Sequence, residues 1–199
     1  MADDKQGRED QARAADRRQR QRDVAAELER MDETEPPVPE TELNDLEREL
    51  GALSFPVTGA EVVETIGDRP IESADGDYTV ADLVPETETE QFDAPEAVRV
   101  RVARPTVAAA MKRIVEASEG LQNTDLKRSQ REAYERTFRE LVAIDAVDED
   151  EGIDVMADWI VERIREKGKL PGSRDVRREA AKYCRKHGYE IRNDEWLGV

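Results

Sequence analysis

Residues that carry metal or redox chemistry are scarce in this 199-residue chain, which has one cysteine, Cys184, and one histidine, His187. A single cysteine excludes an internal disulfide and is typical of a reducing compartment. The two residues are three positions apart on a predicted helix and could share a metal ion. A structural zinc site normally has four ligands, however, and no second pair follows at a matching spacing. We therefore expect no enzyme, no catalytic residue, no cofactor and no bound metal.

Long hydrophobic runs are also lacking. The longest runs from Val107 to Met111, far short of the roughly 18 residues that span a bilayer. The N-terminus has no apolar segment after its charges, so we expect no secretory signal. Aromatic residues make up 5% of the chain and the mean hydropathy is -0.83. These features predict a cytoplasmic protein with no membrane partner, for which a small-molecule substrate is a poor fit.

Charge is abundant and unevenly placed. The chain has 48 acidic and 31 basic residues and a net charge of -17. Residues 1–31 carry eight charges of each sign, residues 32–99 carry twenty acidic and three basic, and residues 100–199 carry twenty of each. Self-repulsion between such charges reaches about 10 Å at 0.1 M salt but only about 3 Å at 1 M. We expect a three-part organisation in a high-salt cytoplasm.

Residues 1–40 are predicted to form a flexible charged arm and a proline-rich linker. Arg, Gln, Asp and Ala dominate the arm, which has no apolar face to bury. Pro36, Pro37 and Pro39 then favour an extended segment.

Residues 41–104 are predicted to form an acidic helix–hairpin–helix module. Its first helix, capped by Thr41, carries one apolar stripe at helical spacing: Leu43, Leu46, Leu50 and Leu53. Thr58 and Glu61 form a capping box for the next helix, with Val57 and Val62 at the staple positions. That helix is expected to end at Gly67 in a left-handed stop.

A hairpin is predicted next, because the segments 69–72 and 77–80, which contain apolar and β-branched residues, flank a turn that ends in Asp-Gly. Asp93 and Glu96 suggest a second capping box, which starts a helix at Ala97. A strand is the alternative, since Val98, Val100 and Val102 alternate with arginines. Pro95 and the cap favour the helix.

Three segments carry a resemblance to a known family: Phe-Pro-Val-Thr-Gly-Ala-Glu-Val-Val at 55–63, Phe-Asp-Ala-Pro-Glu-Ala-Val-Arg at 92–99, and the first eight residues, Met-Ala-Asp-Asp-Lys-Gln-Gly-Arg. Together they resemble a family of small, uncharacterised acidic proteins of halophilic archaea, over roughly the first half of the chain. The resemblance implies a haloarchaeal origin and a compact helix–hairpin–helix module. It implies no activity and no site.

Residues 105–199 are predicted to form a helical domain. One helix starts at Pro105 and stops at Gly120, and a second starts at Thr124 or Asp125. Its apolar side is predicted to carry Leu126, Ala133, Thr137, Leu141 and Ile144. A third runs from Ile153 to Gly168, and a last one, capped by Ser173, runs to His187 with Gly188 beyond it. The predicted fold class is mainly α with a small β-hairpin (α+β).

The last helix is the best functional candidate. Arg174, Arg178, Lys182 and Arg185 fall on one side of it. The opposite side carries Val176, Ala180, Tyr183, Cys184 and His187. Residues 163–187 hold ten basic and three acidic residues, and two helices joined by a Leu-Pro-Gly turn resemble a helix-turn-helix in outline. The simpler interpretations are a solvated helix face, or a face that pairs with the acidic half of the same molecule.

Phosphate contacts alone would fail at high salt, because four of them lower log K by about 0.9 × 4 per decade of salt, or roughly 4–5 decades between 0.1 and 2 M. Base-edge contacts or a protein partner would have to supply the rest. Tyr189 and Trp196 could stack on bases, but we expect them to close a small core.

The sequence thus predicts a non-catalytic interaction or regulatory protein whose basic last helix contacts nucleic acid or a partner protein. The alternative is an acidic adaptor that binds a basic protein partner through residues 41–104, with the leucine stripe as its docking edge. The sequence does not indicate the oligomeric state.

Overall fold

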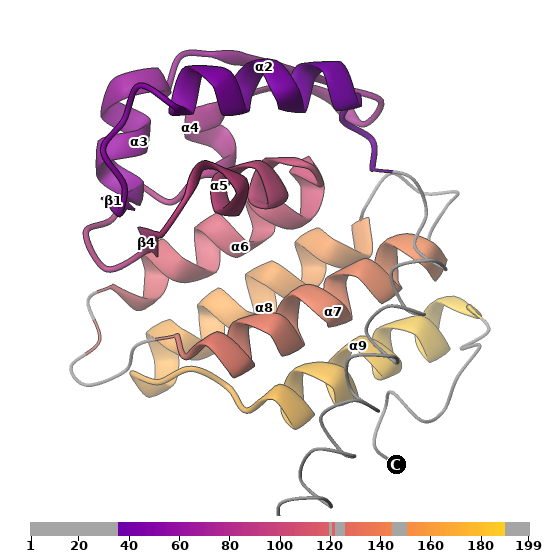
Figure 1. The fold of residues 1–199 in the computed structure, drawn as a ribbon. Coiled ribbons are helices and arrows are strands. Elements are labelled where there is room, and N and C mark those ends of the chain that lie inside the picture. Colours follow the sequence, from indigo (N-terminus) through magenta and orange to yellow (C-terminus); the bar gives the residue numbers. More distant parts are fainter. Residues whose placement is uncertain (1–35, 120, 122–125, 145–150, 190–199) are drawn as a thin grey trace, which may run out of the picture. The chain divides into compact units, whose positions relative to one another are not determined.

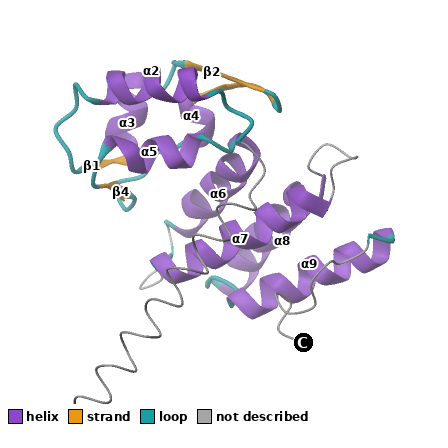
Figure 2. Ribbon diagram, turned by 45° about the vertical axis from the view of Figure 1, so that its right-hand side comes forward, coloured by secondary structure: helices purple, strands orange, loops and turns teal. Residues whose placement is uncertain are grey.

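The computed structural model describes residues 36–119, 121, 126–144 and 151–189. The predicted arm and most of the linker, the helix start at Thr124 or Asp125, and Trp196 lie outside these residues. The described part is mainly helical, with two small antiparallel strand pairs (Figures 1 and 2), and the predicted α+β class is confirmed.

Helix α2 (Glu40–Leu50) buries three members of the predicted leucine stripe: the exposed fractions of Leu43, Leu46 and Leu50 are 3%, 0% and 0%. Leu53, the fourth, lies beyond the helix and packs half-buried against the same cluster. The stripe is therefore core and offers no docking edge. The prediction that Thr41 caps this helix is wrong, since the N-cap is Pro39, without a side-chain hydrogen bond. The proline ring fixes φ near its helix-starting value, and Pro39 O accepts a hydrogen bond from Leu43 N at 3.1 Å.

Helix α3 (Gly59–Ile66) begins with the predicted capping box. Glu61 N donates to Thr58 Oγ1 at 3.2 Å, and Thr58 N donates to Glu61 Oε2 at 2.7 Å. The predicted left-handed stop is wrong, because Gly67 has φ -56°. Glycine fits there for space instead: a Cβ atom would lie 2.4 Å from Val63 O.

The predicted hairpin is confirmed as β2 (Pro70–Ser73) and β3 (Gly76–Thr79), paired in antiparallel register. Sequence reasoning missed the short helix α4 (Val80–Leu83), which starts at a capping box between Thr79 and Asp82. Thr79 N donates to Asp82 Oδ2 at 2.8 Å, so Val80 belongs to a helix and not to the strand. It also missed the pairing of β1 (Val57–Thr58) with β4 (Gln91–Phe92), two residues a side.

The favoured prediction of a helix in this segment is confirmed by α5 (Pro95–Val102), and the alternative of a strand is wrong. Val98 and Val102, four positions apart, are fully buried, whereas Val100 between them is 71% exposed. The predicted capping box of Asp93 and Glu96 is absent: Ala94 is the N-cap and makes no side-chain hydrogen bond. Pro95 at the first helical position starts the helix by its fixed φ.

Four longer helices follow, α6 (Pro105–Ser118), α7 (Arg128–Ile144), α8 (Glu151–Lys167) and α9 (Ser173–His187). The buried side of α7 is formed by Tyr134, Thr137, Phe138 and Leu141. The prediction of this side was right for Thr137 and Leu141 and missed both aromatic residues. Ala133, which it included, is only half-buried.

Helix α6 lies between helices α2 to α5 and helices α7 to α9 (Figure 1), and it contributes side chains to two hydrophobic clusters. Its Ala108 packs in the cluster built from α2 to α5, and its Met111 packs in the cluster built from α6 to α9. The predicted division into residues 1–40, 41–104 and 105–199 stays a prediction.

Candidate interaction surface

Glycines mark the end of α8 and both ends of α9. Gly168, with φ +60°, follows the end of α8, and Gly188, with φ +76°, forms a left-handed stop after His187, where the helix was predicted to end. The prediction that Ser173 caps the helix is wrong, because Gly172 is the N-cap and Ser173 is the first helical residue. The Gly172 carbonyl accepts a hydrogen bond from Val176 N at 3.1 Å, so the backbone alone starts the helix.

The packing side of α9 is confirmed for most of its predicted members. Val176, Ala180 and Cys184 are fully buried and Tyr183 is 8% exposed, in a core shared with α7 and α8. His187 is an exception, since its side chain is exposed in the last turn of the helix. Its Nδ1 atom lies 2.9 Å from Tyr183 O, and its ring centroid lies 4.2 Å from that of Tyr183 with the two planes tilted by 37°, so the imidazole packs on the outside of Tyr183.

The turn before α9 is fastened to α7 by Tyr134. Its Oη atom donates to Pro171 O, and Gln130 Nε2 donates to both Tyr134 Oη at 3.0 Å and Pro171 O at 2.8 Å. Burial raises the pKa of Tyr134 to about 12, so the hydroxyl keeps its proton for this bond. The burial of Tyr134 could have been predicted from the sequence, since Tyr134, Phe138 and Leu141 have the i, i+4, i+7 spacing of a buried helix side.

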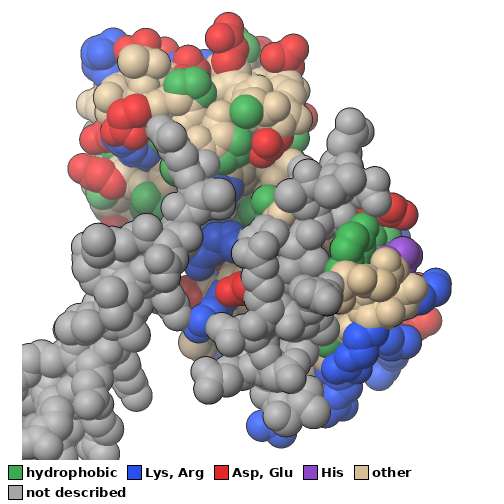
Figure 3. Space-filling view, turned by 90° about the vertical axis from the view of Figure 1, so that its right-hand side faces the viewer, with side chains coloured by type: hydrophobic (Ala, Val, Ile, Leu, Met, Phe, Trp, Pro, Cys, Tyr) green, Lys and Arg blue, Asp and Glu red, His purple; other side chains and the backbone are tan. Residues whose placement is uncertain are grey.

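The opposite side of α9 carries the four predicted cations, Arg174, Arg178, Lys182 and Arg185, which we call the cationic face. All four are exposed, and the exposed fractions of the Arg178 and Lys182 side chains are 71% and 72%. Figure 3 shows Lys and Arg side chains gathered over the lower part of the molecule, whereas Asp and Glu are frequent over the upper part. The prediction that these cations face outward is thus confirmed.

The ion pairs of the cationic face stay within α9. Arg178 Nη1 lies 4.0 Å from Asp175 Oδ1, and Lys182 Nζ lies 2.9 Å from Glu179 Oε1. Exposed pairs of this kind contribute only about 0–1 kcal/mol and exchange readily for other partners. Arg174 and Arg185 form no ion pair within the part of the chain that the structure describes.

The acidic module neutralises charge with its own arginines. Arg69 pairs with Glu42 at 2.7 Å and with Glu49 at 3.0 Å. Arg99 pairs with Glu47 at 2.7 Å and also with Glu40. These ion pairs therefore join Arg69 and Arg99 to carboxylates of α2, and none of them involves the cationic face.

Cys184 and His187, the pair that could share a metal ion, lie in different surroundings. Cys184 is fully buried whereas His187 is exposed. Within the described ranges, no group of three His, Cys, Asp or Glu side chains is placed to hold a metal ion. Tyr189 packs against the core of the bundle, 6.4 Å from the Tyr183 ring, as expected for an aromatic that closes a core.

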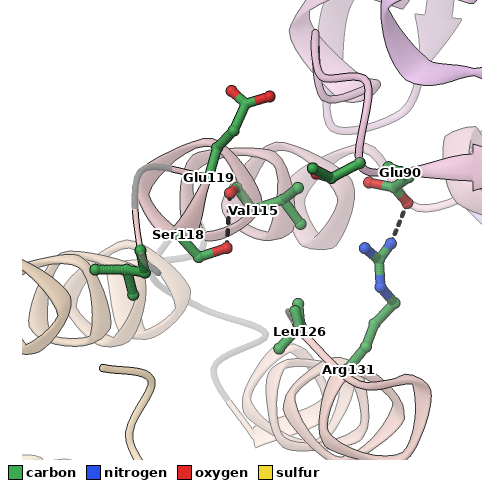
Figure 4. Close-up of a pocket in the computed structure, with 8 residues that line it drawn as sticks. Glu90, Val115, Ser118, Glu119, Leu126 and Arg131 are labelled. Carbon is green, nitrogen blue, oxygen red and sulfur yellow. Dashed lines mark hydrogen bonds and ion pairs between the residues drawn. The ribbon is translucent and has the colours of Figure 1, made fainter. Parts of the chain in front are cut away.

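A small pocket lies between the segment before β4, the end of α6 and the start of α7 (Figure 4). Glu90, Val115 and Arg131 line it, and Glu90 pairs with Arg131 across it. Its volume of about 70 Å³ is well below the roughly 300 Å³ at which small-molecule sites begin. Glu90 Oε2 is buried in this region and has no hydrogen-bond partner among the described residues. A few water molecules would fit there.

Across the described residues, every helix is too short or too polar to pass through a bilayer.

In a comparison with protein families, the model described as "Family of unknown function (DUF5789)" matches residues 40–113. The match runs from the first residue of α2 to Arg113 in α6. It supports an uncharacterised domain in the half of the chain where the sequence resemblance lies. Neither the curated proteins nor the solved structures include a significant match.

Proposed function

We propose that this chain is a non-catalytic interaction or regulatory protein, whose cationic face on α9 contacts a polyanionic surface of nucleic acid or of a protein partner. One observation carries the proposal. The same 15-residue helix buries its apolar side completely and holds Arg174, Arg178, Lys182 and Arg185 outside.

The packing of α9 supports a binding role because it fixes the geometry of the cations. The hydrogen bond between Tyr134 and Pro171 fastens the turn before the helix, and Val176, Ala180 and Cys184 lock its inner side. A preformed row of charges loses less conformational entropy on binding than a flexible tail does.

The working environment in this proposal is the cytoplasm of a halophilic archaeon. The net charge of -17 supports it, because molar salt screens repulsion within the acidic module. The hairpin gives a local example: Glu72 and Asp77 are directly opposed across β2 and β3.

A charge-reversal experiment tests the assignment. The full chain and the variant R174E/R178E/K182E/R185E are titrated with fluorescent duplex DNA, duplex RNA and polyglutamate at 0.15 M and 2 M KCl. We expect at least one probe to bind the native chain and to lose at least tenfold in affinity with the variant, since four attractive charges become repulsive.

The control is R48E, since Arg48 is also exposed (76%) and also pairs within its own helix, with Asp45 at 2.8 Å. It adds negative charge on α2, away from the cationic face, and is compared with the single variant R178E. Equal effects of R48E and R178E, or no binding of any probe by the native chain, would overturn the proposal.

A further inference from the structure

We infer that the partner of the cationic face is double-stranded DNA, and that α9 lies in its major groove. This inference rests on the proposed function and narrows it to one class of macromolecule. Three properties of the cationic face carry it: its chemistry, its lack of aromatic rings and its shape.

The chemistry of the face disfavours a protein partner. Every exposed residue of α9 is polar or charged, and the large hydrophobic side chains exposed in the described residues, Val100 and Val155, belong to α5 and α8. Protein interfaces are built around a desolvated centre of aromatic and apolar anchors, and lysine is depleted there. The cationic face has no such anchor, whereas phosphate contacts need only exposed cations.

The absence of exposed aromatic rings from this face disfavours single-stranded nucleic acid. Proteins that bind single strands stack bases on exposed aromatic side chains. Tyr183 is buried and Tyr189 packs against the core. Trp159 on α8 is half-buried, with the Arg163 guanidinium 5.2 Å from its ring centroid. The exposed ring of His187 lies on the opposite side of α9. Among the described residues, the cationic face therefore offers cations for a backbone but no platform for unstacked bases.

The shape of the face selects B-form DNA among duplexes. A convex helix of 15 residues is about 22 Å long and fits the major groove of B-DNA, about 12 Å wide. The major groove of A-form RNA is too deep and narrow for side chains to read. The arrangement α8–turn–α9 also provides cations beside the helix: Arg165 and Lys167 in the last turn of α8 and Lys169 in the turn are exposed. In a helix-turn-helix the neighbouring helix contacts the phosphate backbone in this way.

The order of the cations along α9 suggests separate roles. The N-terminal part of a recognition helix contacts base edges, so Arg174 and Arg178 would read guanines, whose O6 and N7 atoms accept from a guanidinium. Lys182 and Arg185, further along, would contact phosphates. Base-edge contacts are also what binding at molar salt requires, because the phosphate term weakens steeply with salt.

The test compares four labelled probes on the full chain: a duplex DNA of 24 base pairs, the same duplex as RNA, a single strand of equal charge, and polyglutamate of equal charge. We expect duplex DNA to bind at least tenfold more tightly than each of the others. Methylation of guanine N7, which lies in the major groove, should weaken binding at least threefold in a probe selected from a random library.

The outcomes separate this inference from the proposed function. Tighter binding of RNA, single strands or polyglutamate that R178E abolishes would leave the proposed function standing and overturn duplex DNA as the partner. Unchanged affinity after N7 methylation would overturn the major-groove placement. If none of the four probes binds the native chain, both the proposed function and the inference of a duplex DNA partner are overturned. R178E changes an exposed side chain, and its circular dichroism spectrum checks that it folds.

Discussion

The carboxylate of Glu90 forms an ion pair with Arg131 of α7, which joins the segment before β4 to the helical bundle across 41 positions of sequence. The same Oε1 atom accepts from Arg101 Nη2 of α5 at 3.1 Å, and Arg101 also pairs with Glu135 of α7. The Glu90 side chain is 4% exposed, and those of Arg101 and Arg131 are 14% and 16% exposed. One buried carboxylate thus serves two guanidinium groups at the junction of the two hydrophobic clusters.

Substitution E90Q should lower the free energy of unfolding by about 3 kcal/mol, because the largely buried guanidinium of Arg131 loses its ion-pair partner and that of Arg101 keeps only Glu135. Urea denaturation measures the loss. The control is E49Q, since Glu49 is half-exposed and its partner Arg69 retains Glu42; it should cost less than about 1 kcal/mol. If E90Q and E49Q lowered the free energy of unfolding equally, the buried ion pairs of Glu90 would stabilise the fold no more than the half-exposed pair of Glu49 does.

Substitution Y134F should remove the bond that fastens the turn before α9, at a cost of about 1 kcal/mol at neutral pH. It should also reduce the alkaline loss of stability. Burial raises the pKa of native Tyr134 to about 12, whereas an unfolded tyrosine titrates near pH 10. Between these values the native state binds more protons than the unfolded state, so stability falls as pH rises through that window.

The measurement for Tyr134 is urea denaturation from pH 7 to 11.5 on the native chain, Y134F and Y78F, since Tyr78 is only half-buried in β3. Y134F should be less sensitive to alkali than Y78F. The same sensitivity in both variants would contradict the buried, proton-retaining state of Tyr134.

Salt should stabilise the chain. We expect the melting temperature to be higher in 2 M than in 0.1 M KCl, because repulsion among exposed carboxylates is screened. Glu72 and Asp77 are direct cross-strand neighbours of like charge, which destabilises a strand pair. The variant E72Q/D77N should therefore melt higher than the native chain at 0.1 M KCl and gain less from added salt. No change of native stability with salt would count against a high-salt environment.

The cationic face predicts a gain of binding as well as a loss. Asp175 and Glu179 lie beside Arg178 and Lys182 and compete with a polyanion for them. The variant D175N/E179Q should bind duplex DNA more tightly than the native chain at 0.15 M KCl. The variant D45N/E64Q changes the net charge equally on exposed positions of α2 and α3 and should have a smaller effect. If both variants gained equally in affinity for duplex DNA, the effect would come from net charge alone and not from the cationic face.

The sequence predicted elements best where one local pattern decides the structure. Thr58 and Glu61 placed the start of α3, and the turn ending at Gly76 placed the hairpin. The spacing of Val176, Ala180 and Cys184 gave the buried side of α9 and hence its exposed cations.

The remaining features depend on contacts between distant segments. The pairing of Val57 with Phe92 and the Glu90 ion pairs join residues with no local signature. Two helix starts were misplaced because Pro39 and Gly172 begin helices by backbone geometry, while a nearby threonine or serine looked like the cap. The hydrogen bond of Tyr134 with Pro171 was equally invisible, since the two residues are 37 positions apart.

The salt dependence of duplex DNA binding tests most directly whether the exposed cations of α9 contact phosphates or base edges. Log K is plotted against log [KCl] for the native chain, for R178Q/K182Q and for R48Q. We predict a native slope at least as steep as about -1.8, the value for phosphate contacts by Lys182 and Arg185 alone. The slope should be flatter by about 0.9 for R178Q/K182Q, which loses one phosphate contact, and unchanged for R48Q. A native slope near zero, or the same slope in the native chain and R178Q/K182Q, would contradict the account.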